Sequence, residues 1–152
     1  MRVYLACTVR GDRGGVLAGR AIADRLRALG HEVLTAHLLE DGVDEAEASQ
    51  SERDVFERDR EWLNACDAVV AEASGSTYGV GFEVGYVTGR AASTGQRVFV
   101  LYDAARRPHV SRLMVGYNDA HGAVYEYRSL DEVRAFIDAH FSAVGPDSRR
   151  GG

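Results

Sequence analysis

The residues Ala68-Val69-Val70-Ala71 form an uninterrupted apolar run that constrains the fold of this chain more than any other stretch. A strand that is apolar on both faces must be covered on both sides, which is the situation of a central strand in a parallel sheet. The run leads into a loop from Glu72 to Gly79 and then into a glycine-rich segment that carries Glu83. A carboxylate one turn into such a helix lies where open α/β proteins usually bind their ligands.

The rest of the chain alternates between segments typical of strands and of helices. Further strands are predicted at Arg2 to Cys7, His31 to Ala36, Gln96 to Tyr102 and Ala123 to Tyr127. Helices are predicted at Val16 to Leu29, after a cap at Ser49 or Ser51, across the glycine-rich segment, at Ser111 to Val115 as a short turn, and at Leu130 to Phe141.

Each parallel connection must cross a face of the sheet. The alternation therefore predicts an α/β fold: a single-domain three-layer sandwich with a five-stranded parallel sheet and Rossmann/flavodoxin-like topology. We expect the domain to cover residues 1–142, and residues 143–152 to form a disordered tail.

Two helices have faces that can be assigned from spacing. Gly81, Gly85 and Gly89 repeat every four residues and leave one helix face without side chains, so we expect that face to pack closely on the sheet. The helix after Ser51 has dense charges on its outer face and is expected to turn its apolar residues toward the core. These residues are Val55, Phe56, Trp62 and Leu63.

Size and charge limit the classes of function. A chain of 152 residues with a net charge of −5 has the profile of one globular domain and not of a protein that binds a nucleic acid polymer. No apolar run reaches the roughly 18 residues of a membrane span, and the N-terminus lacks a signal-peptide pattern, so we expect a cytoplasmic protein without a membrane partner. Cys7 and Cys66 are expected to be buried free thiols, and no clustered Cys/His spacing predicts a metal site.

The carboxyl ends of the predicted strands should meet at one ligand-binding edge. That edge would gather the loop from Thr8 to Gly15, the residue His37, and the loop from Ser74 to Gly81. The first loop has neither the dinucleotide-binding glycine spacing nor a phosphate-loop Gly-Lys-Ser/Thr. Its hydroxyl and guanidinium donors, on Thr8, Arg10 and Arg13, nevertheless suit a phosphate, and Thr77 with Gly79 forms a second candidate anion-binding turn. The alternative is a solvated surface loop with ordinary arginines.

Each residue that could take part in catalysis or binding could instead have a purely structural role. Glu83 could act chemically or could only complement the positive end of its helix. Asp59 lies in the charged run 57–61, where most side chains must be solvated. Tyr4, in the first strand, could be a core residue, and His37 could be a hydrogen-bonding loop residue.

A resemblance to a known family rests on a combination of segments that covers nearly the whole chain apart from the tail. The segments are Tyr4-Leu5-Ala6-Cys7-Thr8-Val9-Arg10-Gly11, Asp59-Arg60-Glu61-Trp62-Leu63, Ala68-Val69-Val70-Ala71-Glu72 and Gly79-Val80-Gly81-Phe82-Glu83-Val84-Gly85. With them the chain resembles the 2′-deoxynucleoside 5′-phosphate N-hydrolases of the nucleoside 2-deoxyribosyltransferase superfamily. The resemblance implies a cofactor-free hydrolase that cleaves the N-glycosidic bond of a nucleoside 5′-monophosphate and releases the free base and a sugar 5-phosphate.

The resemblance also implies roles for single residues. Glu83 would be the nucleophile that forms a covalent glycosyl-enzyme, Asp59 would assist protonation of the departing base, and Tyr4 would orient Glu83. Phosphate and sugar would be held by Thr8, Arg10, Gly11, Thr77 and Gly79, with Val9 against the sugar and Ile22 and His37 toward the base. Ser111 would join the phosphate pocket of a neighbouring subunit, which implies a homodimer with shared sites.

The chain departs from the family pattern in the predicted phosphate region. Thr8 and Thr77 stand where serine is more usual, and Asp12 replaces a glycine. A carboxylate at Asp12 would repel a phosphate unless it points away or pairs with Arg10 or Arg13. Three alternatives remain open at this point: a ribonucleotide (CMP-type) N-glycosidase, a nucleoside 2-deoxyribosyltransferase, and a nucleotide-binding module without turnover.

Overall fold

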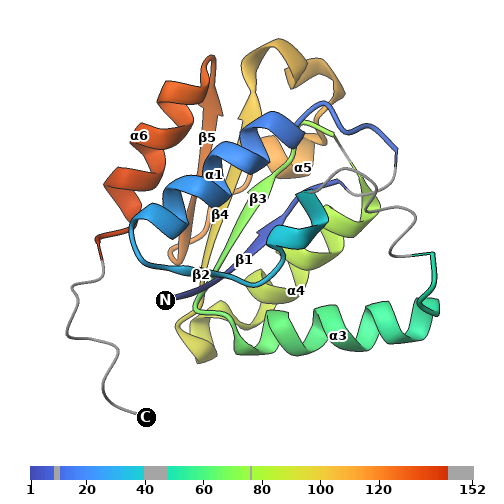
Figure 1. The fold of residues 1–152 in the computed structure, drawn as a ribbon. Coiled ribbons are helices and arrows are strands. Elements are labelled where there is room, and N and C mark those ends of the chain that lie inside the picture. The colour runs from blue at the N-terminus through green and yellow to red at the C-terminus, as the bar shows by residue number, and fades with distance from the viewer. Residues whose placement is uncertain (9–10, 40–47, 76, 144–152) are drawn as a thin grey trace.

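The protein folds around one parallel β-sheet, as predicted. The computed structural model describes residues 1–8, 11–39, 48–75 and 77–143 (Figure 1). Within these ranges the sheet has five strands in the order β2-β1-β3-β4-β5, and every pair of neighbours is parallel. The strands are β1 (Arg2–Ala6), β2 (Glu32–Val33), β3 (Ala68–Glu72), β4 (Arg97–Asp103) and β5 (Gly122–Tyr127).

Helices cover both faces of the sheet and complete the predicted sandwich (Figure 1). Alternate residues of β1 point into two separate cores: Val3 and Leu5 pack with α1 (Val16–Ala28) and α6 (Leu130–His140), while Tyr4 and Ala6 pack with α3 (Glu52–Ala65) and α4 (Tyr78–Thr94). All residues of β3 are buried, which explains its uninterrupted apolar run.

The strand order places a ligand-binding edge between β1 and β3. The chain leaves β1 in one direction to form β2 and then returns to form β3 on the other side of β1. In open parallel sheets, the crevice at such a reversal lies beyond the carboxyl ends of the two strands. The loops that follow Ala6 and Glu72 therefore start next to each other, because Ala6 pairs with Ala71 in the sheet.

The second strand is shorter than predicted. It ends at Val33, and the predicted strand residue Ala36 begins the 3-10 helix η1 (Ala36–Leu39). The Thr35 side chain explains the early end: its Oγ1 accepts a hydrogen bond from the Leu5 N–H at 3.0 Å and donates one to the Leu5 carbonyl at 2.7 Å. A hydroxyl thus replaces the backbone pairing that would have continued the strand.

The predicted packing of the glycine face of α4 is wrong. Gly81, Gly85 and Gly89 are exposed, and a Cβ added at any of them would meet no other atom within 4 Å. The sheet is instead contacted by a stripe of larger apolar side chains, because these bury more area than a glycine face can. The stripe consists of Val80, Val84, Val87 and Ala91. One face of α4 therefore offers bare backbone to the surroundings.

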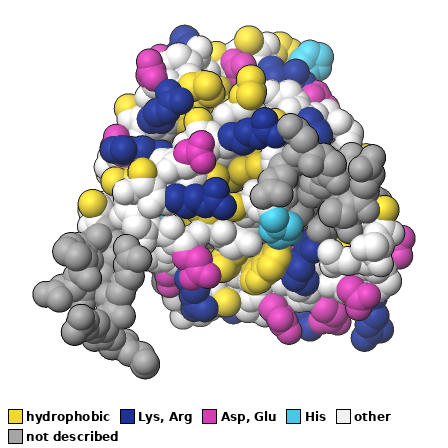
Figure 2. Space-filling model, in the orientation of Figure 1, with side chains coloured by type: hydrophobic (Ala, Val, Ile, Leu, Met, Phe, Trp, Pro, Cys, Tyr) yellow, Lys and Arg dark blue, Asp and Glu magenta, His cyan; other side chains and the backbone are white. Residues whose placement is uncertain are grey.

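The charged helix α3 behaves mostly as predicted. The Ser51 hydroxyl caps its start by accepting a hydrogen bond from Asp54 N–H at 3.2 Å, and acidic and basic side chains lie together over its outer face (Figure 2). Phe56 was expected in the core but is 46% exposed, with its ring centroid 6.3 Å from that of Phe82. Leu63, two turns later on the same side of the helix, is the buried residue of α3, whereas Phe56 lies against the α4 residue Phe82.

The remaining sequence predictions concern the segments after β4, the two cysteines and the tail. The loop after β4 is a 3-10 helix, η2 (Ala104–His109), and the predicted turn is α5 (Arg112–Val115), capped by Ser111. Cys7 and Cys66 are free thiols, as predicted, but only Cys66 is buried, and Cys7 is half-buried. Across the described residues no helix is long and apolar enough to cross a membrane. The predicted tail lies outside the described residues from position 144 onward.

Candidate active site

A buried tyrosine and a carboxylate meet above the sheet, on the face covered by α3 and α4. Tyr4 projects from β1 and is completely buried, and Glu83 lies in the second turn of α4. The Tyr4 hydroxyl donates a hydrogen bond to Glu83 Oε1 at 2.6 Å. This short, charge-assisted contact fixes the direction of the carboxylate. A carboxylate that only complemented its helix end would not need a buried partner from another element.

The surroundings of Glu83 bring the pKa of its carboxyl group close to neutral pH. Burial raises the pKa of Glu83 to about 7, the Tyr4 hydrogen bond opposes this rise, and the nearby Asp59 carboxylate adds to it. Burial, followed by the charge of Glu83, raises the pKa of Tyr4, so the tyrosine remains a neutral donor. At neutral pH the site therefore contains a carboxyl group that can exist in either protonation state.

This shift has a consequence for stability. The folded-state pKa of Glu83 is raised from 4.5, so its contribution to stability is fully present below pH 4.5 and is lost as pH rises through about 7. We expect Glu83→Gln, which keeps the Tyr4 hydrogen bond without the buried charge, to increase the free energy of unfolding at pH 8 by roughly 1–3 kcal/mol. Denaturant unfolding at pH 5 and pH 8 measures this, and a gain that is equal at both pH values would contradict it.

Asp59 reaches the same site from α3. Its charge is close enough to raise the pKa values of both Tyr4 and Glu83. Arg58 forms an ion pair with it, at 2.9 Å from Nη2 to Oδ1, and its guanidinium lies 4.9 Å from the ring centroid of Trp62. His37, on η1, meets Trp62 edge-on at 5.5 Å.

The contacts of Trp62 add two residues to the site that sequence reasoning missed. Helical spacing predicts Trp62 toward the core, against which it does pack, and the charged run predicts a solvated Arg58. The available signal was their position, one residue before Asp59 and three after it, on one side of a helix. With His37 they form an aromatic and cationic wall next to Asp59.

The two loops at the β1/β3 edge bring their hydroxyl groups together. Thr8 Oγ1 and Thr77 Oγ1 are 3.4 Å apart although the residues are 69 positions apart in the chain. Gly11 has a φ of 97°, a backbone conformation that favours glycine. Gly79 is exposed in the first turn of α4. Val9 and Arg10 lie outside the described residues.

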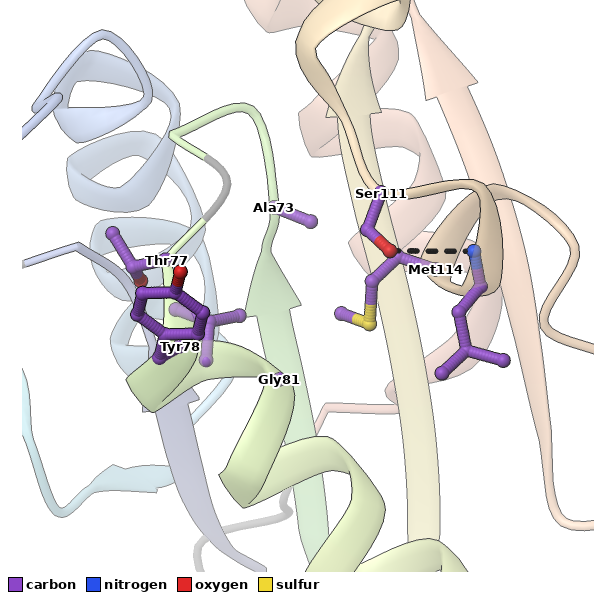
Figure 3. Close-up of a pocket in the computed structure, with 8 residues that line it drawn as sticks. Ala73, Thr77, Tyr78, Gly81, Ser111 and Met114 are labelled. Carbon is purple, nitrogen blue, oxygen red and sulfur yellow. Dashed lines mark hydrogen bonds between the residues drawn. The ribbon is translucent and has the colours of Figure 1, made fainter.

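Ser111 and Ile22 are the remaining predicted site residues. Ser111 borders a cavity of about 370 Å³ between the start of α4 and α5, opposite Thr77, Tyr78 and Gly81 (Figure 3). Its Oγ accepts a hydrogen bond from Leu113 N–H at 3.3 Å. Ile22 is completely buried on the α1 side of the sheet, whereas Tyr4 belongs to the core on the α3/α4 side. The structure thus brings Thr77 and Ser111 to one cavity and leaves Ile22 away from the Tyr4–Glu83 pair.

The chemistry of the site is that of paired carboxylates with hydroxyl donors. Among the residues that the structure describes, no group of three His, Cys, Asp or Glu side chains could hold a metal ion. A carboxylate with a pKa near neutrality next to a second carboxylate suits nucleophilic or acid–base work. The hydroxyl pair of Thr8 and Thr77, at a helix start, suits an anionic group.

Comparisons with known proteins agree with this chemistry. The family model for nucleoside 2-deoxyribosyltransferase matches residues 3–130. Human 5-hydroxymethyl-dUMP N-hydrolase is 33% identical over 147 residues, which cover 95% of this chain and 81% of that protein. A Thermofilum pendens protein with the provisional name 2′-deoxynucleoside 5′-phosphate N-hydrolase 1 is 34% identical over 139 residues, or 91% of this chain and 94% of that protein. The structure of Clostridium botulinum CMP N-glycosidase shares the fold, with a TM-score of 0.66 and 17% identity over 93% of this chain and 100% of that one.

Proposed function

Because the chain belongs to the nucleoside 2-deoxyribosyltransferase family, we propose that it hydrolyses the N-glycosidic bond of 2′-deoxynucleoside 5′-monophosphates. The products would be the free base and 2-deoxyribose 5-phosphate. The observation that carries the proposal is the Tyr4–Glu83 hydrogen bond of 2.6 Å, which lies on the same sheet edge as the Thr8–Thr77 hydroxyl pair. The Tyr4–Glu83 pair suits attack on a sugar carbon, and the Thr8–Thr77 pair suits binding of the phosphate that holds the sugar in place.

The proposed reaction has two steps, as in retaining glycoside cleavage. In the first, a Glu83 oxygen attacks the anomeric carbon, the bond from that carbon to the base nitrogen breaks, and the base leaves with the electron pair. Asp59 assists the transfer of a proton to the leaving base, which would otherwise depart as an anion. In the second step, water attacks the same carbon and gives a proton to Asp59, which restores the proton used in the first step, and the bond from that carbon to Glu83 breaks to release the carboxylate.

Substrate binding is assigned to the loops around these carboxylates. Hydroxyl and backbone donors of Thr8, Gly11, Thr77 and Gly79 would hold the phosphate and sugar, together with Val9 and Arg10. His37 would face the base, and the contacts of Trp62 with His37 and Arg58 support a base site at this wall. Ile22 is not included, because its buried side chain offers no surface to a ligand.

A panel of substrates tests the proposal. Purified protein is incubated with 2′-deoxynucleoside monophosphates, ribonucleoside monophosphates and unphosphorylated nucleosides, and released base is measured by chromatography. We expect release from the deoxynucleoside monophosphates. Release from none of the monophosphates would overturn the proposal, and release from nucleosides with transfer to an added acceptor base would indicate a transferase instead.

We also propose a homodimer that uses the exposed face of α4. This face combines the open glycines with large exposed apolar side chains at its start and on the nearby α5: Tyr78 is 99% exposed, Phe82 53% and Leu113 85%. Of these residues, Tyr78, Gly81 and Leu113 line the cavity that Ser111 borders, so a second subunit seated there would bring the two sites together. Bare glycine backbone allows two helices to approach closely.

Gly85→Arg is expected to convert the dimer to a monomer, because a long charged side chain would project from the centre of this face. Sedimentation velocity measures the change in mass. Leu17→Arg is the matched control, since Leu17 is 65% exposed on α1, and it should leave the mass unchanged. A wild-type protein that sediments as a monomer at micromolar concentration would refute the dimer.

A further inference from the structure

Arg106 joins the two loops of the proposed phosphate site, although it belongs to neither. It lies on η2, after β4, and its Nε donates a hydrogen bond to the Ser74 carbonyl at 3.0 Å in the loop after β3. Its Nη2 donates to the carboxylate of Asp12 in the loop after β1. One guanidinium thus connects three segments that are distant in the sequence.

The segments that Arg106 connects are packed too closely for side chains. A Cβ on Gly75 would lie 2.3 Å from Thr8 Oγ1 and 2.4 Å from the Asp12 carbonyl oxygen. A Cβ on Gly14 would lie 2.7 Å from Arg106 Nη1. Gly75 is therefore required, because the Asp12 carbonyl is backbone, whereas a side chain at Gly14 would have to displace the end of the Arg106 side chain. The backbone of Asp12 therefore lies next to the Thr8 hydroxyl.

A buried network fixes the Ser74 end of this connection to the sheet. The Ser74 hydroxyl accepts a hydrogen bond from Asp103 N–H at 2.8 Å and donates one to Glu72. Glu72 is 1% exposed and accepts a second hydrogen bond from the Tyr127 hydroxyl at 2.8 Å. Arg106 therefore ties Asp12 to a rigid part of the molecule.

The pairing answers the question that Asp12 raises in the sequence. A carboxylate next to a phosphate subsite repels the ligand, and the expected partners were Arg10 and Arg13. Among the residues that the structure describes, Arg106 forms an ion pair with Asp12, and Asp12 Oδ1 also accepts a hydrogen bond from Gly14 N–H at 2.9 Å. The first contact ties the carboxylate to η2, and the second holds it within its own loop.

We propose that Arg106 is a positioning residue for the phosphate subsite, which pairs with Asp12 so that its charge does not oppose the phosphate of the substrate. This inference rests on the proposed function. The Nε of Arg106 is engaged by the Ser74 carbonyl and its Nη2 by Asp12, so the pairing is the role that these contacts support. The ion pair between Arg106 and Asp12 is partly exposed, and such pairs contribute little to the stability of the fold. We therefore expect the loss of Arg106 to weaken substrate binding and not folding.

The test compares single and double variants. Arg106→Ala leaves the Asp12 charge unpaired and is expected to raise KM for a 2′-deoxynucleoside monophosphate about 10-fold while kcat stays within about 2-fold. Adding Asp12→Asn to it removes that charge and should restore KM to within about 3-fold of wild type. Because the effect is between exposed charges, it should shrink at high salt. Arg107→Ala, on the same helix but paired with Glu126, is the control and should change neither value.

The possible outcomes separate the inference from the proposed function. If the double variant binds as poorly as Arg106→Ala, Arg106 contacts the phosphate itself or only supports the loop, and the inference is wrong. A fall in kcat without a change in KM would also overturn it. Calorimetry with the monophosphate and the same variants, each made in a Glu83→Gln background, compares their Kd values without turnover. Absence of turnover in the wild type would count against the proposed function alone.

Discussion

Glu83→Gln is expected to reduce base release from 2′-deoxynucleoside monophosphates by at least about a thousandfold. The amide has nearly the size of the carboxyl group and can still accept the Tyr4 hydrogen bond, so the site should keep its shape. It lacks the negative charge that attacks the anomeric carbon and stabilises positive charge on the sugar. The measurement is the steady-state rate of base release, determined by chromatography.

The pH dependence of the wild type provides an independent check on the same residue. The nucleophile must be deprotonated, and burial raises the pKa of Glu83 to about 7. We therefore expect kcat/KM of the free enzyme to fall as pH decreases below about 7.

Glu61→Gln is the matched control for Glu83→Gln, because Glu61 is exposed on α3. A Glu83→Gln protein that retains more than about a tenth of the activity would rule out the nucleophilic role.

The sequence was sufficient to predict the sheet and its functional edge, because both follow from local patterns. The apolar run of β3 shows burial on both faces, and the parallel order then brings the loops after β1 and β3 together. The same alternation that sends Val3 to one core sends Tyr4 to the other. The alternation alone could not show that Tyr4 would meet Glu83, a contact that only the family resemblance implied, since the two residues are 79 positions apart and their contact depends on how α4 rotates over the sheet.

Helix rotation and loop contacts account for what the sequence did not reveal. The glycines of α4 could have faced the sheet, but the stripe that contains Val80 and Val84 took that place. The Arg106–Asp12 pair spans 94 positions and depends on the path of two irregular segments. Thr35 ended β2 through its own hydroxyl, an alternative that propensity does not distinguish from strand continuation. In each case several local arrangements were open, and tertiary packing chose between them.

Asp59→Asn is expected to lower kcat for natural nucleotides by about 10²- to 10⁴-fold, the usual range for losing a proton-transferring group. Asp59 lies close enough to influence the charge of Glu83, and the wall of Trp62 and His37 stands next to it. The amide cannot deliver a proton, so the base would have to leave as an anion. Glu57→Gln, on the same helix and paired with Arg60, is the control and should keep wild-type activity.

Substrates with different leaving groups distinguish proton transfer from a general loss of structure. A 2-deoxyribose 5-phosphate derivative whose leaving group is a stable anion, such as a nitrophenolate, needs no proton when it departs. If Asp59 assists protonation, Asp59→Asn should cleave this substrate at a rate within about 10-fold of wild type while remaining slow on nucleotides. Glu83→Gln should be slow on both, because each substrate needs the nucleophile. Equal losses of Asp59→Asn on the two substrates would instead assign Asp59 to the placement of Arg58 and the base wall, through the 2.9 Å ion pair seen here.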